Sequence, residues 1–267
     1  WIADFRDPWT EIFYFKDLHL TYFAKKYHHY LEKKVLQKAD DVITVSSQWQ
    51  KDFQKFRKET VLISNGFDHE DYIIAKERED NKYFTISHIG TLTYEQNPFQ
   101  LWKVLNVICL ESTEFSKKLR IRLVGKVDKS VITQIKKYNL DDKLSFIDYI
   151  PHSEVVKEQQ NADILLLLLV HSRKSAKGIL PAKLFEYLAV QRPILAIGST
   201  ESNVADVLKD TKAGCIVDFD DKEILKKTIL SYFNDFQKGN LNNLTSNIEK
   251  YTRQNLTKEL VKLLDNS

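Results

Sequence analysis

Short apolar segments alternate with amphipathic stretches along residues 83–217. Six of these segments predict strands, because they are short, rich in β-branched or aliphatic residues and bounded by polar loops. They lie at residues 83–89, 120–124, 144–147, 164–170, 193–197 and 215–217. Segment 164–170 is almost wholly apolar, as is typical of a parallel strand buried on both faces, and it is too short to cross a membrane. The alternation predicts an α/β unit with a doubly wound parallel sheet, which binds ligands beyond its carboxyl edge.

The beginning of the chain carries a shorter version of the same alternation. Strands are expected at residues 1–5, 41–46 and 60–64, and a helix at residues 47–57. A long helical pattern ends near residue 38, and its apolar residues recur every three or four positions, which predicts one buried stripe. The stripe comprises Leu20, Phe23, Tyr27, Leu31 and Val35, and the opposite face carries Lys25, Lys26, Lys33 and Lys34.

These two alternations predict two lobes. Residues 1–72 form the rear part of the first lobe, and the charge-dense stretch within 73–82 is expected to link it to the second lobe at 83–240. The last segment, 241–267, ends in a helical pattern that we expect to pack back across the lobes. The first residues resemble the middle of a fold and the sequence contains no methionine, so we expect an upstream part of the natural protein to be missing.

Composition narrows the function classes. With 267 residues, 43% of them hydrophobic, the chain is long enough for more than one core. The 40 basic and 37 acidic residues nearly balance at +3, which argues against nucleic-acid binding. Two cysteines, Cys109 and Cys215, make neither a disulfide framework nor a metal cluster. Together with the lack of a signal peptide, this favours a reducing cytoplasm.

The loop and helix after segment 164–170 carry the most specific chemistry. Gly178 gives the backbone freedom, Pro181 suits a first helical turn, and Glu186 on that helix still faces the carboxyl edge of the sheet. Amides at a helix N-terminus bind anions, and a carboxylate accepts hydrogen bonds from both hydroxyls of a diol. The pattern therefore suits a nucleoside diphosphate with its ribose. Alternatively, Glu186 is an exposed glutamate on the surface of the helix, and Gly178 belongs to an ordinary turn.

Glycines also end the first two strands of the second lobe. Gly90 would let the backbone approach a phosphate, Thr91 adds a hydroxyl donor, and Lys126 after Gly125 either approaches the phosphates or is a solvated loop lysine. Neither the dinucleotide pattern G-x-G-x-x-G nor the phosphate loop G-x-x-x-x-G-K-[ST] occurs. Their absence argues against hydride transfer and against an ATPase.

Taken in order, the motifs of the whole chain resemble nucleotide-sugar glycosyltransferases of the GT-B fold, most of all the retaining family 4 enzymes, which often build bacterial surface polysaccharides. The segments that carry this resemblance are 1–9, 39–46, 64–68, 88–91 and 178–193. It implies two Rossmann-like lobes, an incomplete acceptor lobe followed by a donor lobe. It also implies a hexosyltransferase-type enzyme that moves a sugar from a nucleoside diphosphate donor to a hydroxyl of a saccharide or lipid-linked saccharide, without a cofactor or metal.

The resemblance assigns roles to individual residues. Glu186 would hold the donor ribose, Tyr149 and Ile150 would lie against the nucleobase, and the amides of Gly178 and Ile179 would contact phosphate or sugar oxygens. An aromatic residue next to a proline is equally normal in a packed turn, and Gly178 could be an ordinary turn glycine.

Charged residues complete the expected site. Lys183 lies one turn before Glu186, so it could reach the diphosphate or form a surface ion pair with that carboxylate. Asp4, Arg6 and Asp7 crowd the end of the first strand, either as a cleft constellation or as a salt-bridged corner. Asp7 is our candidate for acceptor binding or proton handling.

Two departures from the family bear on this assignment. Members often carry a second glutamate eight positions before the ribose-binding one, where this chain has Gly178. An arginine or lysine often follows the first glycine loop, whereas residues 94–98 contain no basic side chain. Compensation of the diphosphate charge then falls to backbone amides and to nearby cations, namely Lys177, Lys183, Arg173 or Lys174.

The sequence leaves two alternatives to a glycosyltransferase open. A nucleotide-sugar epimerase would bind the same donor, and a degenerate glycosyltransferase lobe would bind it without turnover. Lysines beside Phe and Tyr in residues 13–38 also suit an anionic membrane surface, which would make the protein peripheral at the inner face of the cell membrane. An ordinary packing helix accounts for the same pattern.

Overall fold

Two parallel sheets organise the chain. The computed structural model describes residues 1–267 except 13, 58, 73–81, 171–176, 242–244 and 267. Within these residues, the first sheet has the order β1-β2-β3 and the second the order β6-β5-β4-β7-β8-β9. The first consists of β1 (Ile2–Phe5), β2 (Asp41–Thr44) and β3 (Val61–Leu62). The second consists of β4 (Phe84–Ile89), β5 (Leu119–Val124), β6 (Leu144–Ile147), β7 (Ile164–Leu168), β8 (Ile194–Ile197) and β9 (Gly214–Val217).

All the pairings between these strands are parallel. The prediction of an α/β fold with parallel sheets is therefore confirmed.

Helices cover both faces of the second sheet. One face packs against α3 (Phe99–Glu111), α4 (Thr113–Lys118), α5 (Lys129–Lys137) and α9 (Lys222–Gln237). The other packs against α6 (His152–Gln160), α7 (Ala182–Val190) and α8 (Asn203–Thr211). Along β7, Leu166 joins the first core while Leu165 and Leu167 join the second. Both faces of the strand are buried, which explains why its sequence is apolar throughout.

The order of the second sheet reverses between β4 and β7. Successive strands run outward from β4 to β6 on one side and from β7 to β9 on the other, and the point where the two halves meet is the topological switch point of the sheet. The ladder between β4 and β7 is short and ends at the pair Ser87–Leu165. The carboxyl ends of both strands therefore border this switch point.

The first unit is smaller. Its strands pack with α1 (Tyr22–Lys38) and α2 (Ser47–Phe53) around a core that includes Phe5, Leu36, Val42 and Trp49. Thr21 and Ser46 cap the two helices, each accepting a hydrogen bond from a backbone amide of the first turn. Short 3-10 helices occur at Phe15–Asp17, Glu70–Tyr72, Tyr94–Gln96, Asp141–Lys143 and Ile248–Tyr251.

The buried stripe predicted for α1 is wrong at Phe23 and Tyr27, although Val35 packs against the core of the first unit. Phe23 is 81% exposed and Tyr27 is 60% exposed, whereas the buried residues of the helix are Glu32 and Leu36. Glu32 can be buried because Oε1 accepts hydrogen bonds from the backbone amides of Trp9 (2.9 Å) and Thr10 (3.1 Å), and Oε2 accepts one from the Thr10 hydroxyl. The helix therefore turns its glutamate inward and its aromatic residues outward.

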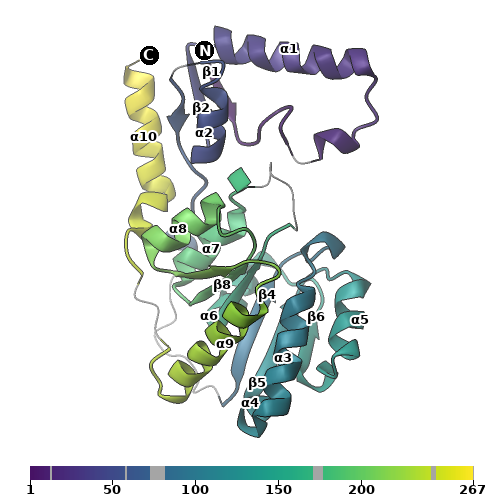
Figure 1. The fold of residues 1–267 in the computed structure, drawn as a ribbon. Coiled ribbons are helices and arrows are strands. Elements are labelled where there is room, and N and C mark those ends of the chain that lie inside the picture. Colours follow the sequence, from purple (N-terminus) through teal and green to yellow (C-terminus); the bar gives the residue numbers. More distant parts are fainter. Residues whose placement is uncertain (13, 58, 73–81, 171–176, 242–244, 267) are drawn as a thin grey trace.

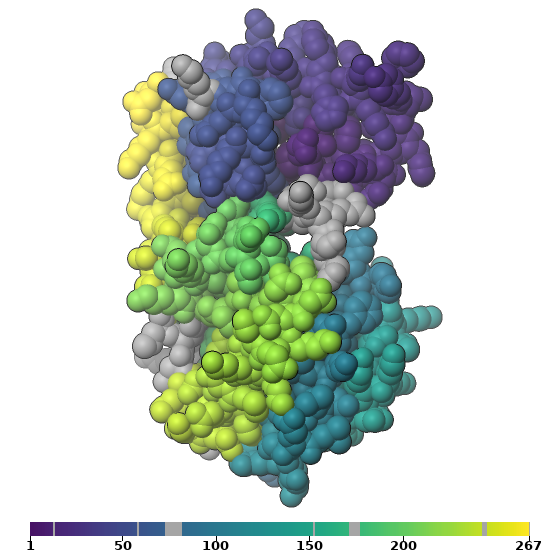
Figure 2. All heavy atoms as spheres, in the orientation of Figure 1, coloured from purple at the N-terminus to yellow at the C-terminus, as the bar shows by residue number. Residues whose placement is uncertain are grey.

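The end of the chain returns to the first unit. Helix α10 (Arg253–Asp265) lies alongside the strands and α2 of that unit (Figure 1), and the space-filling view shows it as the yellow flank of the molecule (Figure 2). Phe67 fixes its start, because its amide donates to Tyr251 O (3.0 Å) and its carbonyl accepts from Arg253 N (2.8 Å). In the described part of the chain, no helix has the length and apolar composition needed to cross a membrane.

Candidate functional site

Two glycines shape the carboxyl edge at the switch point. Gly90 and Gly125 follow β4 and β5 with φ of +117° and +111°, a region that other residues rarely adopt. A Cβ on Gly125 would lie 2.8 Å from Gly90 O, and a Cβ on Gly90 would lie 2.9 Å from the Lys183 ammonium nitrogen. The absence of side chains thus lets both turns and Lys183 come together. Thr91, the next residue, is exposed at this edge.

Helix α7 points its N-terminus toward the same edge. Its N-cap is Pro181, which makes no side-chain hydrogen bond to the first turn, whereas Ser202 caps α8 by accepting from Ala205 N. Within the described residues, Pro181 therefore gives the first amides of α7 no side-chain acceptor, and unpaired amides at a helix N-terminus are suited to bind an anion.

Lys183 extends into this site from the first turn of α7. Its ammonium lies 3.0 Å from His88 Nε2, and the i to i+3 spacing does not produce the direct ion pair with Glu186 that it suggested. Burial lowers the pKa of Lys183 to about 8, and the charge of Glu186 opposes this shift. An anion that approaches such a desolvated cation stabilises its charged form.

Glu186 is half-buried at the end of the first turns of α7. Its Oε2 accepts a hydrogen bond from Gln159 Nε2 of α6 at 3.2 Å, and the side chain is not directed into bulk solvent. Tyr72 lies near enough to feel its charge: burial raises the pKa of Tyr72, and Glu186 raises it further. The carboxylate therefore keeps accepting capacity beside a cation and the free end of a helix.

The other predicted cations lie differently. Lys177 forms an ion pair with Glu201, and Lys126 is exposed. Arg173 and Lys174 lie outside the described residues. Of the predicted cations that the structure describes, Lys183 is the one brought beside Gly90 and Glu186.

Gly178 and Ile179 contact the first unit. The backbone of Gly178 has no positive φ; a Cβ there would instead lie 2.4 Å from the indole nitrogen of Trp49. Ile179 packs against the core of the first unit, and Asn65 donates a hydrogen bond to Leu180 O (3.4 Å). Close packing, rather than a special backbone conformation, therefore explains the glycine. The phosphate contacts expected of these two amides stay a prediction.

The segment after β6 lies at the surface. Tyr149 is 82% exposed, while Ile150 packs against the core that α7 and α8 share. Its contact with a nucleobase stays a prediction.

The charged residues after β1 form mainly an exposed corner. Arg6 pairs with Asp4 at 2.9 Å and its guanidinium also reaches Asn65. Asp7 is exposed, yet neighbouring protein atoms desolvate its carboxyl group enough to raise its pKa. The salt-bridged corner considered from the sequence is present at Asp4 and Arg6. The role of Asp7 in acceptor binding or proton handling stays a prediction.

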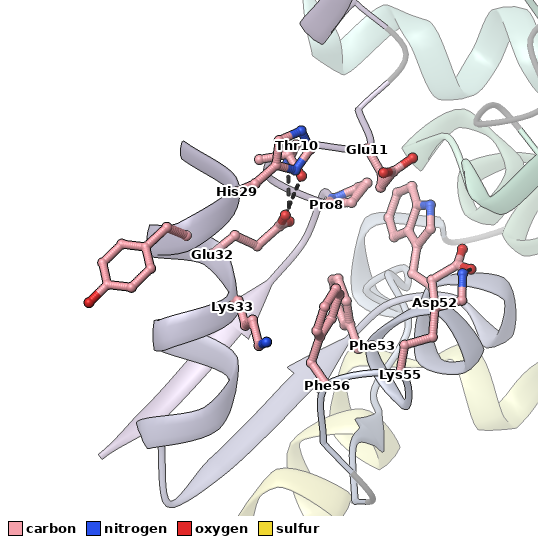
Figure 3. Close-up of a pocket in the computed structure, with 12 residues that line it drawn as sticks. Pro8, Thr10, Glu11, His29, Glu32, Lys33, Asp52, Phe53, Lys55 and Phe56 are labelled. Atoms are coloured by element: carbon pink, nitrogen blue, oxygen red, sulfur yellow. Dashed lines mark hydrogen bonds and ion pairs between the residues drawn. The ribbon is translucent and has the colours of Figure 1, made fainter. Parts of the chain in front are cut away.

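A pocket of about 360 Å³ lies between α1 and α2 and was not predicted from the sequence. Figure 3 shows Phe53 and Phe56 rising toward the space that Glu32 and Lys33 border from α1. The pocket is lined by Pro8, Thr10, Glu11, His29, Tyr30, Glu32, Lys33, Trp49, Asp52, Phe53, Lys55 and Phe56. Trp49 also touches Gly178, so this pocket adjoins the loop that precedes α7. The aromatic spacing within residues 49–56 was the available signal.

A second pocket of about 360 Å³ lies where the two units and α10 meet. Asn203 of α8 crosses this junction: its Oδ1 accepts from Gln48 N (3.1 Å) and its Nδ2 donates to the Ser47 hydroxyl (2.7 Å). The two pockets and the switch-point edge are separate features. In the described ranges, no group of three or more His, Cys, Asp and Glu residues is arranged to hold a metal ion.

Two parallel-sheet units joined by a returning C-terminal helix have the architecture of the GT-B fold, and the sequence match to a family model identifies the class as glycosyltransferase. Residues 70–255 match the family model described as glycosyl transferases group 1, and the chain belongs to this family. No curated protein sequence matches the chain.

Solved structures support the fold. Sucrose-phosphate synthase from Thermosynechococcus elongatus is similar with a TM-score of 0.71 at 15% identity, over 100% of this chain and 67% of that one. Anabaena HepE in complex with UDP and glucose has a TM-score of 0.72 at 15% identity, over 100% and 71%. WaaG, a glycosyltransferase involved in lipopolysaccharide biosynthesis, has a TM-score of 0.67 at 10% identity, over 96% and 73%.

Proposed function

We propose that this glycosyltransferase transfers a sugar from a nucleoside diphosphate donor to an acceptor hydroxyl, with retention of anomeric configuration. The donor binds at the carboxyl edge of the second sheet. The observation that carries this proposal is the meeting of Gly90, Lys183 and Glu186 at the switch point, beside the uncapped N-terminus of α7. The diphosphate would meet the α7 amides and the charge of Lys183 there, and the ribose would meet the carboxylate of Glu186.

In this proposal, each residue meets one part of the donor. The carboxylate of Glu186 accepts from the ribose hydroxyls, while Lys183 and the first amides of α7 meet the diphosphate. Tyr149 and Ile150 lie against the base. Gly90, Thr91 and Lys126 line the phosphate side, Lys177 contributes to the compensation of the diphosphate charge, and the amides of Gly178 and Ile179 contact phosphate or sugar oxygens.

The first unit is proposed to supply the acceptor side. Residues 1–72 then belong to the acceptor lobe and 83–240 to the donor lobe, linked by 73–82 and spanned by 241–267. The pocket between α1 and α2 supports this division, since aromatic rings with charged groups at the rim suit a saccharide, and Trp49 connects the pocket to the donor loop. Asp7 is the candidate for proton handling. The acceptor is a saccharide or a lipid-linked saccharide.

The exposed aromatic residues of α1 support a peripheral contact with an anionic membrane. We propose that the protein works at the cytoplasmic face of a bacterial membrane, within the retaining family 4 group that builds surface polysaccharides. Lys26 lies 4.7 Å from the centroid of the Tyr22 ring, which keeps a cation next to an exposed aromatic side chain. Such pairs suit the interface between water and lipid headgroups.

Catalysis in this account rests on positioning and on stabilising the departing diphosphate. Lys183 and the helix amides supply positive charge where the leaving group gains negative charge. We propose no metal requirement and no cofactor, so chelation by EDTA should leave the transfer rate unchanged.

Incubation with radiolabelled UDP-glucose and GDP-mannose, followed by separation of the products, tests the proposal. Sugar transfer to an acceptor or donor hydrolysis supports it. An epimerised donor would instead indicate an epimerase, and binding without turnover would indicate a non-catalytic subunit.

A further inference from the structure

His88 is a buried side chain at the switch point to which the proposed function gives no role. It is the next residue after the last ladder pair of β4 and β7, and it is fully buried. Its Nδ1 lies 3.0 Å from Leu166 O of β7, and its Nε2 lies 3.4 Å from Thr91 O and 3.0 Å from the Lys183 ammonium. The imidazole thus joins β4, β7 and α7 where the sheet divides.

The two nearer partners of His88, Leu166 O and the Lys183 ammonium, each at 3.0 Å, decide its tautomer over the longer 3.4 Å approach of Thr91 O to Nε2. Leu166 O can only accept, so Nδ1 carries the proton. The Lys183 ammonium can only donate, so Nε2 offers its lone pair. A protonated imidazole would place two donors and two positive charges in contact. Burial, and then the charge of Lys183, lower the pKa of His88 to about 3, so the neutral ring is the stable form.

A neutral acceptor matters at this position because, among the residues that the structure describes, His88 is the hydrogen-bond partner found for the Lys183 ammonium. Its ammonium lies in a largely buried site, its interaction with Glu186 is longer-range, and Gly90 leaves the space into which it extends. A lysine side chain has several rotatable bonds, and fixing them costs free energy. An acceptor at 3.0 Å, itself locked by β7, selects one orientation.

We propose that His88 is a positioning residue that holds the Lys183 ammonium at the carboxyl edge, where it meets the diphosphate of the donor. The inference rests on the proposed function, because it assigns the anion that Lys183 meets. His88 itself does not touch the donor. It acts as a fixed acceptor for Lys183, and Lys183 supplies the positive charge that the loop at 94–98 lacks.

Three substitutions separate this role from simple packing. His88→Gln retains an acceptor at the distance of Nε2, His88→Asn retains the contact with Leu166 O but does not reach Lys183, and His88→Leu retains only volume. We expect UDP or GDP affinity, measured by calorimetry, to stay within about threefold in His88→Gln and to fall about tenfold in the other two. Melting temperatures show whether each variant is folded. If His88→Leu does not fold, the comparison of nucleotide affinity between His88→Asn and His88→Gln is the test.

A double-mutant cycle with Lys183→Met completes the test. If His88 acts through Lys183, His88→Asn costs nothing further in the Lys183→Met background. An additive loss overturns the inference, as does equal affinity of His88→Gln and His88→Asn in the presence of Lys183.

A ligand-free measurement distinguishes failure of the proposed function from failure of the inference. The pH dependence of Lys183 acylation, followed by mass spectrometry, reports its pKa without nucleotide. If the wild type binds neither UDP nor GDP, the donor assignment fails. The positioning role is then overturned if the pKa of Lys183 is the same in His88→Asn as in the wild type. It is supported if the pKa of Lys183 is lower in His88→Asn and unchanged in His88→Gln.

Discussion

Lys183 connects protonation to ligand affinity. Burial lowers its pKa to about 8, and the ionisable groups that act on it are His88, which stays neutral, and Glu186. Below this pKa the side chain is a cation that attracts a diphosphate, and above it that attraction is lost. The affinity for nucleotide therefore depends on pH through one residue.

We expect the affinity of the wild type for its nucleoside diphosphate to be steady near pH 7 and to fall about tenfold by roughly pH 9.5, because Lys183 loses its proton. Calorimetric titrations across this range measure the effect. Lys183→Met should bind weakly with a flat profile, whereas Lys129→Met, at an exposed lysine, should keep the wild-type profile. A wild-type affinity that does not change over the range contradicts the assignment.

Gly178 tests the contact between the units. A Cβ would lie 2.4 Å from the Trp49 indole nitrogen, so Gly178→Ala should destabilise the protein by about 1–3 kcal/mol and lower its melting temperature. Combining it with Trp49→Leu, which makes room, should cost less than the sum of the two single changes. Strictly additive effects would show that the two residues do not meet.

At the residue scale, the sequence predicts those placements that follow from a residue's position along a helix. Glu186 was placed near the carboxyl edge because it follows Pro181 on a short helix. The contact between Lys183 and His88 was not predictable, since the two residues are 95 positions apart and meet only through the sheet order. Likewise, the chain pattern could not reveal that Trp49 fills the space above Gly178.

At the scale of elements, α1 shows where periodicity is insufficient. Strands β4 to β9 were located because burial on one or both faces leaves an apolar record in the sequence. The buried face of α1 contains a glutamate whose charge is satisfied by the loop at Trp9 and Thr10. Hydrogen bonds from another segment leave no periodic signal, so the exposed aromatic face was taken for the core.

The exposed aromatic face of α1 leads us to predict that the protein binds anionic membranes. We expect the protein to cosediment with vesicles of phosphatidylcholine and phosphatidylglycerol, less so at high salt because the lysines are screened. The double substitution Phe23→Ser and Tyr27→Ser should reduce binding at least about fivefold, since both rings leave the interface. Leu110→Ser is the matched control, because Leu110 is 79% exposed on α3 of the other unit. An equal loss in the control refutes a specific contact through α1.

At the scale of the whole molecule, two sheets meet through a small set of contacts. Trp49 touches Gly178, Asn203 bonds to the start of α2, and Phe67 pairs with Thr252 before α10. The ordered series of motifs indicated the two-lobed fold from the sequence. The pockets between helices and between units were not foreseen, because they arise from how separate elements pack.

The central claim is that Glu186 helps to bind a nucleoside diphosphate at the edge of the second sheet. The most direct test is calorimetric titration of the protein with UDP and with GDP, repeated for Glu186→Ala and for Glu154→Ala, a change at an exposed glutamate of α6. We predict that the wild type and Glu154→Ala bind one of the two nucleotides equally well, and that Glu186→Ala binds it at least about tenfold more weakly. Equal affinity of the wild type and Glu186→Ala would contradict the account.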